Sequence, residues 1–530
     1  YKRQECGRAL RGADEMNIKK LASLLFQRSV IVALLIFLQA AMLLLYMLWF
    51  SSDFIYVYWG CVVLSILAVL IIVSRQTDPG YKIAWIITIL LFPAFGWLVY
   101  LLCGGNKLSA RKRRKMQGMD RTMLEQLERD YKAEELRPFG ADAVNQARYL
   151  EHYARCPVYT NTYTHYFPLG DDVFPAMLEE LRKAEKYIFL EYFIISPGIF
   201  WDSMVEILKE KHAAGVDVRV IYDDVGSLNT LPMNYARKFE AETGIPCCCF
   251  NRFKPVISIR MNNRDHRKIM VIDGKVGFTG GINLADEYIN AKVKYGHWKD
   301  SAIMVRGDAA WSMAVMFLTL WDDVRETLTE DYDQFRPVWA PGEKPEGTQG
   351  FVQPYTDNPL DGEAVGQSVY LNLINKARKY VYITTPYLIV DNSMNNALCI
   401  AAKSGVDVRI MTPHIPDKRA VFELTRSHYE PLLEAGVKIY EYTPGFVHAK
   451  NFAVDDEYGT VGSINLDYRS LFLHFENGVW LCSDPSVLDI KADFLETLEQ
   501  CQPVTLEQCR ALPWWRTLFR SVLRMFAPLM

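Results

Sequence analysis

The stretch 264-RDHRKIMVIDGKVGFTGGIN-283 determines how the rest of the sequence is interpreted. His266 and Lys268 lie two residues apart and apolar residues follow them, so we expect a strand in which both side chains project from one face. Asp273 and Gly274 have the composition of a hairpin turn that ends this strand. The stretch therefore predicts an imidazole and an ammonium group presented side by side.

The same arrangement occurs a second time, in 447-VHAKNFAVDDEYGTVGSIN-465, with identical spacing from the histidine to the final Ile-Asn. One HxK pair arises often by chance, but two in the same context indicate chemistry. The glycines would let backbone approach a ligand, and the asparagine amides offer hydrogen bonds. The candidate catalytic residues are His266, Lys268, Asp273, His448, Lys450 and Asp455; the candidate phosphate-supporting residues are Gly280, Gly281, Asn283, Gly462, Ser463 and Asn465.

The residues around the two motifs are also duplicated. The segments 186-KYIFLEYFII-195 and 379-KYVYITTPYLIV-390 match, and each leads through a helical stretch to a GVDVR segment. Short apolar runs that alternate with helical stretches are typical of α/β architecture. We therefore expect a first domain over 156–340, a Pro/Gly-rich linker over 341–350 and a second domain over 351–503.

Two facing sets of His, Lys and Asn side chains suit attack on a phosphodiester. One neutral imidazole can attack phosphorus, and the other, protonated, can give its proton to the leaving alkoxide. The lysine and asparagine side chains would stabilise charge on the non-bridging oxygens. The sequence shows no CxxC, HExxH or other zinc-type spacing, so neither a metal nor a cofactor is expected.

Three apolar runs of about 20 residues, 30–50, 54–73 and 83–103, are long enough to cross a hydrocarbon core as helices. They form an expected membrane region over 29–104. The preceding segment 1–28 is polar, and its residues 1–15 stand apart from the expected fold because Met16 resembles a natural start. A basic linker over 105–155 follows, and its cluster 107-KLSARKRRK-115 is expected to hold the C-terminal domains in the cytoplasm.

The third run contains 92-FPAFG-96, whose Pro and Gly break a helix and permit a re-entrant hairpin. Three true spans would place the N-terminus and the basic cluster on opposite sides, against the usual distribution of basic residues. Two interpretations remain open: a third segment that dips into the membrane and returns, or three spans with the N-terminus outside.

The C-terminal segment 504–530 is expected to form an amphipathic interfacial helix. Arg516, Arg520 and Arg524 recur every four residues and so share a face, while most of the other residues in 513-PWWRTLFRSVLRMF-526 are apolar. Such a helix suits the surface of an anionic membrane, and packing on the protein core is the alternative.

The chain resembles the bacterial cardiolipin synthases of the phospholipase D superfamily, which carry two HKD motifs. The resemblance rests on "LEYFII", "NRDHRKIMVIDG", "TGGINLADEY", "GHWKDSAIMVRG", "TTPYLIVD", "VHAKNFAVDD" and "GSINLDYRS". It implies N-terminal membrane helices followed by two tandem phospholipase D-like α/β domains packed about a pseudo-twofold axis.

The resemblance also implies roles for individual residues. His266 would be the nucleophile and His448 the general acid and later base, although the reverse assignment stays open. Asp300 and Glu476 would orient the two histidines, while Asp273 and Asp455 would brace the turns. Glu191 is a pocket residue or a structural one. Two departures stand out: Gly281 stands where the general superfamily pattern has serine, although GGIN is a familiar variant among cardiolipin synthases, and His474 stands where an asparagine is expected.

The implied reaction is phosphatidyl transfer between two phosphatidylglycerol molecules through a phosphatidyl-histidine intermediate, giving cardiolipin and glycerol. Attack by water would instead give phosphatidic acid, and another alcohol such as phosphatidylethanolamine would give a different lipid. Nucleic-acid cleavage and a non-enzymatic scaffold are weaker alternatives, because of the apolar runs and the two intact His/Lys pairs. The expected partners are phosphatidylglycerol, other anionic phospholipids and the bacterial inner membrane, which the chain would cross more than once. No nucleic-acid partner is expected, and a homo-oligomer is left open.

Overall fold

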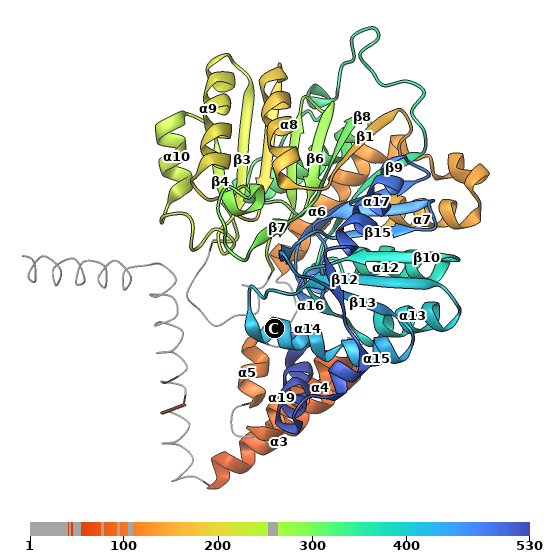
Figure 1. The fold of residues 1–530 in the computed structure, drawn as a ribbon. Helices are drawn as coiled ribbons and strands as arrows, with labels where there is room; N and C mark the ends of the chain where they lie inside the picture. Colours follow the sequence, from red (N-terminus) through yellow and green to blue (C-terminus); the bar gives the residue numbers. More distant parts are fainter. Residues whose placement is uncertain are drawn as a thin grey trace, which may run out of the picture. The chain divides into compact units, whose positions relative to one another are not determined.

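The computed structural model describes residues 41, 44–45, 55–75, 79–92, 96–103, 110–252 and 263–529 (Figure 1). The chain divides into a smaller unit, formed by Tyr1–Asn106, Ser227–Tyr235 and Phe253–Met261, and a larger unit, formed by Lys107–Gly226, Ala236–Arg252 and Asn262–Met530.

The described part of the smaller unit contains three helices that pack against one another: α3 (Ile55–Ser74), α4 (Pro79–Leu91) and α5 (Gly96–Cys103). The rings of Trp85 and Tyr100 lie 5.3 Å apart. In one continuous helix these residues would be separated by about 22 Å along the axis. The chain therefore turns back between α4 and α5, where the Pro and Gly of 92–96 predicted a break.

Gly96 allows the close approach of these two helices, because a Cβ atom there would lie 2.7 Å from the Cα of Ile89. The first apolar run, 30–50, lies almost wholly outside the described residues. Among the helices that are described, none is both long and apolar enough to cross a membrane. The structure thus does not establish the membrane helices that the sequence predicts.

The first half of the larger unit is built on a seven-stranded sheet with the order β1-β8-β6-β5-β2-β3-β4. β2, β3 and β4 run parallel, whereas β5, β6, β8 and β1 pair antiparallel. The strands are β1 (Thr162–Phe167), β2 (Tyr187–Tyr192), β3 (Asp217–Asp223), β4 (Cys247–Phe250), β5 (Lys268–Ile272), β6 (Val276–Gly280) and β8 (Ala302–Gly307).

The second half is built on an eight-stranded sheet with the order β19-β13-β12-β10-β15-β16-β18-β9. Its strands are β9 (Phe351–Asp357), β10 (Tyr380–Thr384), β12 (Asp407–Pro413), β13 (Lys438–Tyr442), β15 (Asn451–Val454), β16 (Tyr458–Gly462), β18 (Glu476–Cys482) and β19 (Cys501–Pro503). Two-stranded pairings add β7 (His297–Lys299) with β14 (Gly445–Val447), and β11 (Leu388–Ile389) with β17 (Leu466–Asp467).

The two sheets correspond strand by strand. The order β1-β8-β6-β5-β2-β3-β4 matches β9-β18-β16-β15-β10-β12-β13, and β19 is added beside β13. The two GVDVR segments lead into β3 and β12, which pair in parallel with β2 and β10. The predicted duplication into two tandem α/β domains is therefore confirmed at the level of individual strands.

Helices cover both sheets, and two of them join the halves. The helices are α8 (Gly170–Lys183), α9 (Ile199–Ala213), α10 (Tyr235–Thr243) and α11 (Ala310–Arg325) in the first half, and α12 (Val365–Lys376), α13 (Asn392–Lys403), α14 (Arg419–Ser427), α15 (Tyr429–Glu434), α16 (Tyr468–Phe472) and α17 (Ser486–Leu498) in the second. α11 packs on its own sheet and on β9, while α17 packs on its own sheet and on β1. Figure 1 shows the two halves as the yellow-green and cyan-blue parts of the ribbon.

One hydrophobic core runs through both halves. The equivalent strands β6 and β16 contact each other, and α11 is buried from Ala310 to Trp321 because it lies against the core on all sides. Ahead of the first sheet, α6 (Ala110–Leu127) packs on α11 and α7 (Ala141–Tyr153) packs on α12. The histidine motifs therefore lie in halves that form one packed body.

The C-terminal residues form α18 (Leu506–Arg510) and α19 (Trp514–Phe526). Arg516 and Arg520 of α19 are turned toward the protein, whereas Arg524 is exposed. Arg520 is 8% exposed and its Nε donates to Glu423 Oε2 at 2.8 Å, and Arg516 also binds Glu423 on α14. The apolar side chains point outward instead, with these exposed fractions: Trp514 77%, Trp515 58%, Leu518 56%, Phe519 48% and Val522 43%.

Candidate active site

A short backbone pairing between the halves sets the position of His266. Its N–H donates to the carbonyl of Phe475 at 2.9 Å, and the Phe475 N–H donates to the carbonyl of Arg264 at 2.8 Å. The Arg264 guanidinium is anchored in turn by the buried carboxylate of Asp223, with Nε to Oδ2 at 2.9 Å. His266 is thus held directly beside Glu476 of the other half.

An equivalent pairing sets the position of His448. Strands β7 and β14 run parallel, and the His448 N–H donates to the carbonyl of Lys299 at 2.7 Å. This places His448 beside Asp300. Strands β5 and β15 begin only at Lys268 and Asn451, so both histidines precede the strands in which they were predicted. The segments that carry them pair with the opposite half instead.

The two histidines are each paired with a carboxylate from the other half. His266 Nδ1 lies 2.9 Å from Glu476 Oε1 and 3.0 Å from Oε2. His448 Nδ1 lies 2.6 Å from Asp300 Oδ2. Each motif histidine takes its carboxylate from the opposite half, so the motifs, Asp300 and Glu476 make one site at the junction of the halves.

Additional hydrogen bonds fix both carboxylates. Glu476 accepts from Ser463 Oγ at 2.5 Å and from Ser470 Oγ at 2.7 Å, and Asp300 Oδ1 accepts from the Ser301 N–H at 2.8 Å. Burial alone would raise the pKa of Glu476, but the charge and hydrogen bond of His266 hold it well below its usual value. Burial acts on Asp300 in the same direction, and Lys450 and His448 outweigh it and lower the pKa of Asp300.

Both imidazoles are neutral at pH 7 in this environment. Burial, followed by the nearby charge of Lys450, lowers the pKa of His448 to about 4, and burial lowers the pKa of His266 well below its usual value. With each Nδ1 bonded to an ionised carboxylate, the proton is assigned to Nδ1 and the lone pair to Nε2. Each Nε2 is therefore available to attack or to accept a proton.

The two lysines lie in the same buried site. Lys450 Nζ lies 2.8 Å from His448 Nδ1 and 3.1 Å from Nε2, and Lys268 Nζ lies 5.5 Å from the centre of the Phe193 ring. Burial lowers the pKa of Lys268 to about 7 and that of Lys450 to about 8. Each lysine also responds to both carboxylates, which shows that the charges of the two halves act on one another.

Aromatic side chains that the sequence analysis did not single out surround the histidines. Phe193 contacts His266 edge to face at 4.9 Å between ring centres. The rings of Tyr288, Trp298 and Phe446 lie 5.6, 5.5 and 5.9 Å from that of His448. The position of Trp298, two residues before Asp300, was the available signal. These rings explain the desolvation of the imidazoles.

The glycines of the motifs admit neighbouring protein atoms. A Cβ atom at Gly280 would lie 2.3 Å from the Ser301 carbonyl oxygen, and one at Gly462 would lie 2.4 Å from that of Asn477. At Gly281 a Cβ would lie 2.0 Å from Asp300 Oδ1. The absence of the family's serine at 281 therefore makes room for the carboxylate that binds His448.

The two asparagines of the motifs differ in their surroundings. The Asn283 amide is engaged within the protein, because its Oδ1 accepts from the Ile194 N–H at 3.0 Å and its Nδ2 donates to Tyr288 at 2.7 Å. Asn465 Oδ1 is buried and has no hydrogen-bond partner within the described part of the chain. Asn465 thus keeps a free acceptor, which a hydroxyl group of a substrate can bind.

Asp273 and Asp455, candidate catalytic residues that the resemblance implied would brace the turns, bind backbone N–H groups away from the reacting groups. Asp273 accepts three backbone N–H groups at 2.8–2.9 Å, those of Glu185, Lys186 and Tyr187. Asp455 accepts the equivalent three, those of Arg378, Lys379 and Tyr380, at 2.6–2.8 Å. Each aspartate follows the far end of its strand, roughly 20 Å along the chain from the motif histidine. Through these hydrogen bonds, Asp273 fixes the first motif turn to the start of β2, and Asp455 fixes the second motif turn to the start of β10.

Glu191 is a buried structural residue rather than a pocket residue. It is fully buried on β2, and its Oε1 lies 2.6 Å from the Nε of Arg267, which also lies 3.3 Å from Asp265. This ion pair fixes the chain on both sides of His266, because Asp265 and Arg267 are its immediate neighbours.

A buried histidine outside the motifs belongs to the same cluster. His474 is 8% exposed, and its Nδ1 lies 3.6 Å from Glu476 Oε1, beyond hydrogen-bond length. Its ring centre lies 5.4 Å from that of His266. No local zinc-type spacing in the sequence indicates the grouping of these three side chains, because His266 is far from His474 and Glu476 in sequence.

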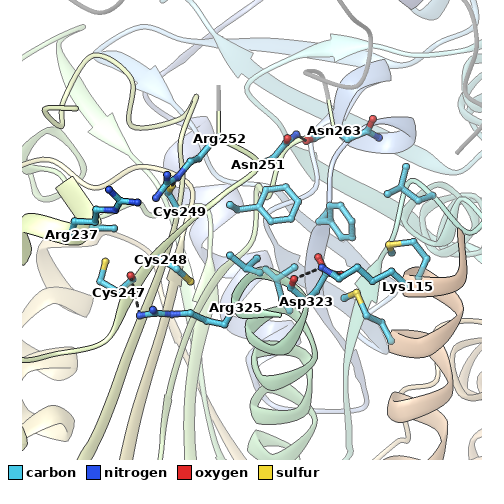
Figure 2. A pocket seen from close by; sticks show the side chains of 18 of the residues that line it. Lys115, Arg237, Cys247, Cys248, Cys249, Asn251, Arg252, Asn263, Asp323 and Arg325 are labelled. Atoms are coloured by element: carbon cyan, nitrogen blue, oxygen red, sulfur yellow. Dashed lines mark hydrogen bonds and ion pairs between the residues drawn. The ribbon is translucent and has the colours of Figure 1, made fainter. Parts of the chain in front are cut away.

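A cavity of about 550 Å³ is lined by residues of α6, of the first half and, through Leu360 and Phe475, of the second half (Figure 2). Lys115, Arg237, Arg252 and Arg325 outnumber the acids Glu240 and Asp323 in its lining, and Figure 2 shows the ion pair between Lys115 and Asp323 at 3.1 Å. Phe475 also lines it, but none of the motif histidines or lysines does. The cavity is therefore separate from the histidine site.

Two α/β halves that each supply a His/Lys pair, and that exchange carboxylates at their junction, have the architecture of a phospholipase D-like phosphoryl-transfer enzyme. Residues 177–305 and 370–498 match the family described as "Cardiolipin synthase, PLD-like domain", and residues 63–105 match "Phospholipase D-nuclease N-terminal". The chain belongs to the cardiolipin synthase family of the phospholipase D superfamily.

Individual relatives and one solved structure are similar to this chain. A cardiolipin synthase of Halalkalibacterium halodurans is 34% identical over 466 residues, covering 87% of this chain and 91% of the relative. An uncharacterized protein of Streptococcus mutans is 44% identical over 473 residues, covering 87% of this chain and 99% of its own. The crystal structure of phosphatidylserine synthase from Haemophilus influenzae has the same fold, with a TM-score of 0.55 and 15% identity over 72% of this chain and 97% of that one.

Proposed function

We propose that this enzyme transfers a phosphatidyl group from one phosphatidylglycerol to the headgroup hydroxyl of another, releasing glycerol and forming cardiolipin. The observation that carries the proposal is the crossed pairing of His266 with Glu476 and of His448 with Asp300 in one buried site. The site holds two imidazoles with unprotonated Nε2 atoms, as a two-step transfer requires.

In the first step, His266 Nε2 attacks the phosphorus of the donor lipid. The bond from phosphorus to the glycerol headgroup oxygen breaks, and His448, protonated at Nε2, gives its proton to that oxygen. Glycerol leaves and a phosphatidyl group remains on His266. Glu476 stabilises the positive charge that forms on the His266 ring, because its Oε1 accepts a hydrogen bond from the Nδ1–H group, with 2.9 Å between Nδ1 and Oε1.

In the second step, His448 accepts the proton of the acceptor's hydroxyl group through Nε2. The resulting alkoxide attacks phosphorus, the P–N bond breaks, and His266 returns to its neutral form. The proton held by His448 is then available for the next donor. Asp300 orients His448 in both steps and compensates its charge.

The ammonium groups of the two lysines supply charge stabilisation at the phosphate. A phosphodiester anion between the histidines would attract the ammonium of Lys450 away from the His448 ring, which raises the pKa of that ring toward the value needed for an acid. The assignment of His266 as nucleophile and His448 as acid follows the family resemblance. The near symmetry of the two pairs makes the reverse order the natural alternative.

The same proposal places the enzyme at the cytoplasmic face of the bacterial inner membrane. Support comes from the N-terminal family match over 63–105, the apolar runs of the sequence and the outward apolar face of α19. The proposal includes the domain limits expected from the sequence. It leaves open the side of the membrane on which the N-terminus lies. A reporter fused at residue 1 distinguishes a re-entrant third segment from a third span.

Lipid analysis tests the proposal directly. The purified full chain is incubated with phosphatidylglycerol, and the lipids are separated by thin-layer chromatography while released glycerol is measured. Cardiolipin and glycerol in equal amounts support transfer, whereas phosphatidic acid as the sole product would show that water is the acceptor. Adding phosphatidylethanolamine tests whether another alcohol enters the site.

Variants connect the reaction to the site. His266→Ala and His448→Ala should each abolish turnover, because each removes a group used in both steps. His165→Ala changes an exposed histidine on β1 and serves as the matched control. Substantial activity in either motif variant would refute the shared site.

A further inference from the structure

The strongest unexplained feature of the larger unit is the imidazole of His474. The residue is 8% exposed, and neither ring nitrogen has a hydrogen-bond partner within the described ranges. Buried polar atoms in proteins are nearly always paired with protein, water or an ion. The resemblance to the family implies an asparagine at this position, so His474 departs from the expected pattern.

The ring lies next to two other ligand-type groups. One donor atom from each of His266, His474 and Glu476 can be chosen so that all three lie within 4.8 Å of one another. The His266 Nδ1 to Glu476 Oε1 distance is 2.9 Å, and the His474 Nδ1 to Glu476 Oε1 distance is 3.6 Å. Donor atoms around one tetrahedral zinc ion are separated by roughly 3.3 Å, given metal–ligand bonds of about 2.0–2.1 Å. The observed separations lie on either side of this value.

The chemistry of the three groups selects the kind of ion. Two imidazoles and one carboxylate are the ligands of many zinc sites and suit first-row transition metals, whereas calcium and magnesium prefer oxygen ligands alone. All three side chains are buried and belong to segments that backbone hydrogen bonds hold in place, so little rearrangement is needed.

We propose that His266, His474 and Glu476 bind a zinc-class divalent ion, and that the bound ion blocks the histidine chemistry. The ion takes the place of the proton between His266 Nδ1 and Glu476, so it removes the carboxylate that compensates charge on the His266 ring. The binding claim stands by itself; the claim of inhibition rests on the proposed function.

Binding is measured without reference to lipid turnover. The tag-free full chain in detergent is titrated with Co²⁺, whose visible absorption reports nitrogen and oxygen ligands, and with Zn²⁺ by calorimetry. One ion per chain, removable by a chelator, is expected. His474→Asn should weaken binding by at least about 10-fold, because loss of a direct ligand exceeds the effect of changing an outer partner. His152→Gln, at an exposed position on α7, is the matched control and should bind as the unchanged chain does.

Thermal unfolding confirms that each variant is folded, and His474→Gln replaces His474→Asn if the latter is not. The proposal is overturned if the unchanged chain gives no cobalt bands, or if the His474 variants bind as tightly as it does. Binding that leaves cardiolipin formation unaffected overturns the claim of inhibition alone. Absence of any lipid turnover in the metal-free chain counts against the proposed function and leaves the binding result intact.

Discussion

Replacing Gly281 by serine, the residue that the superfamily pattern has at this position, is expected to inactivate the enzyme. A Cβ atom at 281 would lie 2.0 Å from Asp300 Oδ1, whereas ordinary contacts begin at 3.4 Å. The carboxylate must therefore retreat by about 1.4 Å. Its 2.6 Å hydrogen bond to His448 Nδ1 would then exceed hydrogen-bond range.

The size of the effect follows from what this hydrogen bond does. A hydrogen bond to a charged group contributes about 1.5–3 kcal/mol, and loss of the orienting carboxylate in a comparable His–Asp arrangement costs about 10⁴-fold in turnover. We expect cardiolipin formation by Gly281→Ser to fall by about 10²- to 10⁴-fold. The assay measures initial rates from labelled phosphatidylglycerol, together with thermal unfolding to confirm that the variant is folded.

The second half suggests how to restore the lost activity. There the equivalent positions carry Ser463 and Glu476, whose side chains are hydrogen-bonded at 2.5 Å. The double variant Gly281→Ser with Asp300→Glu reproduces this combination and should recover most of the lost activity. Ser463→Gly is the matched control and should cost about 10-fold, because Glu476 keeps Ser470 and His266 as partners. Gly281→Ser with a rate within threefold of the unchanged enzyme would show that the clash argument is wrong.

Four further predictions concern the site, its charges, its frame and its membrane contact. A donor lipid with a p-nitrophenol headgroup needs no acid to leave, so His448→Asn should accumulate a phosphatidyl adduct that peptide mass mapping locates on His266; no adduct in this variant, together with an adduct on His448 in His266→Asn, would reverse the roles. Because the pKa of Lys268 is lowered to about 7 and that of Lys450 to about 8, kcat/KM should fall as the pH rises through 7 to 8 and the ammonium groups lose their protons, and a profile that stays flat to pH 9 would contradict this. Asp273→Asn and Asp455→Asn should each lower the free energy of unfolding by about 1–3 kcal/mol in urea titrations, yet leave kcat within about threefold, since both side chains bind backbone N–H groups away from the histidines. Brominated phosphatidylglycerol should quench tryptophan fluorescence less in Trp514→Phe/Trp515→Phe than in the unchanged chain, while Trp339→Phe, outside α19, should leave the quenching unaltered.

The sequence predicts the fold well because the duplication repeats both a strand pattern and a chemical motif. The GVDVR segments and the HxK spacing mark equivalent strands, and the structure pairs β2 with β3 and β10 with β12 as this implies. The sequence does not predict that the carboxylates cross between the halves. Glu476 follows His448 in the chain but binds His266, 210 residues earlier. Only the packing of the halves determines this choice.

Periodicity defines the faces of a helix without saying what each face contacts. The spacing of the arginines in α19 predicts that they share a face. It does not predict that Arg516 and Arg520 bind Glu423, which lies 93 and 97 residues earlier in the chain. The grouping of His474 with His266 escaped detection for a similar reason, since its members come from different halves. The role of Gly281 is equally hidden in the sequence, because it depends on the close approach of Asp300 Oδ1, which occurs only in the folded chain.

Because the halves exchange carboxylates, each half supplies a residue that the histidine of the other half needs. Expressed separately, residues 156–340 and 351–503 would each hold a histidine without its acid, and the two fragments would regain activity only after reassociation. The same arrangement couples the evolution of positions that are distant in sequence. A substitution at Glu476 alters the environment of His266, and a substitution at Asp300 alters that of His448. Two copies that arose by duplication thus remain free to diverge on their outer surfaces while their junction evolves as a single unit.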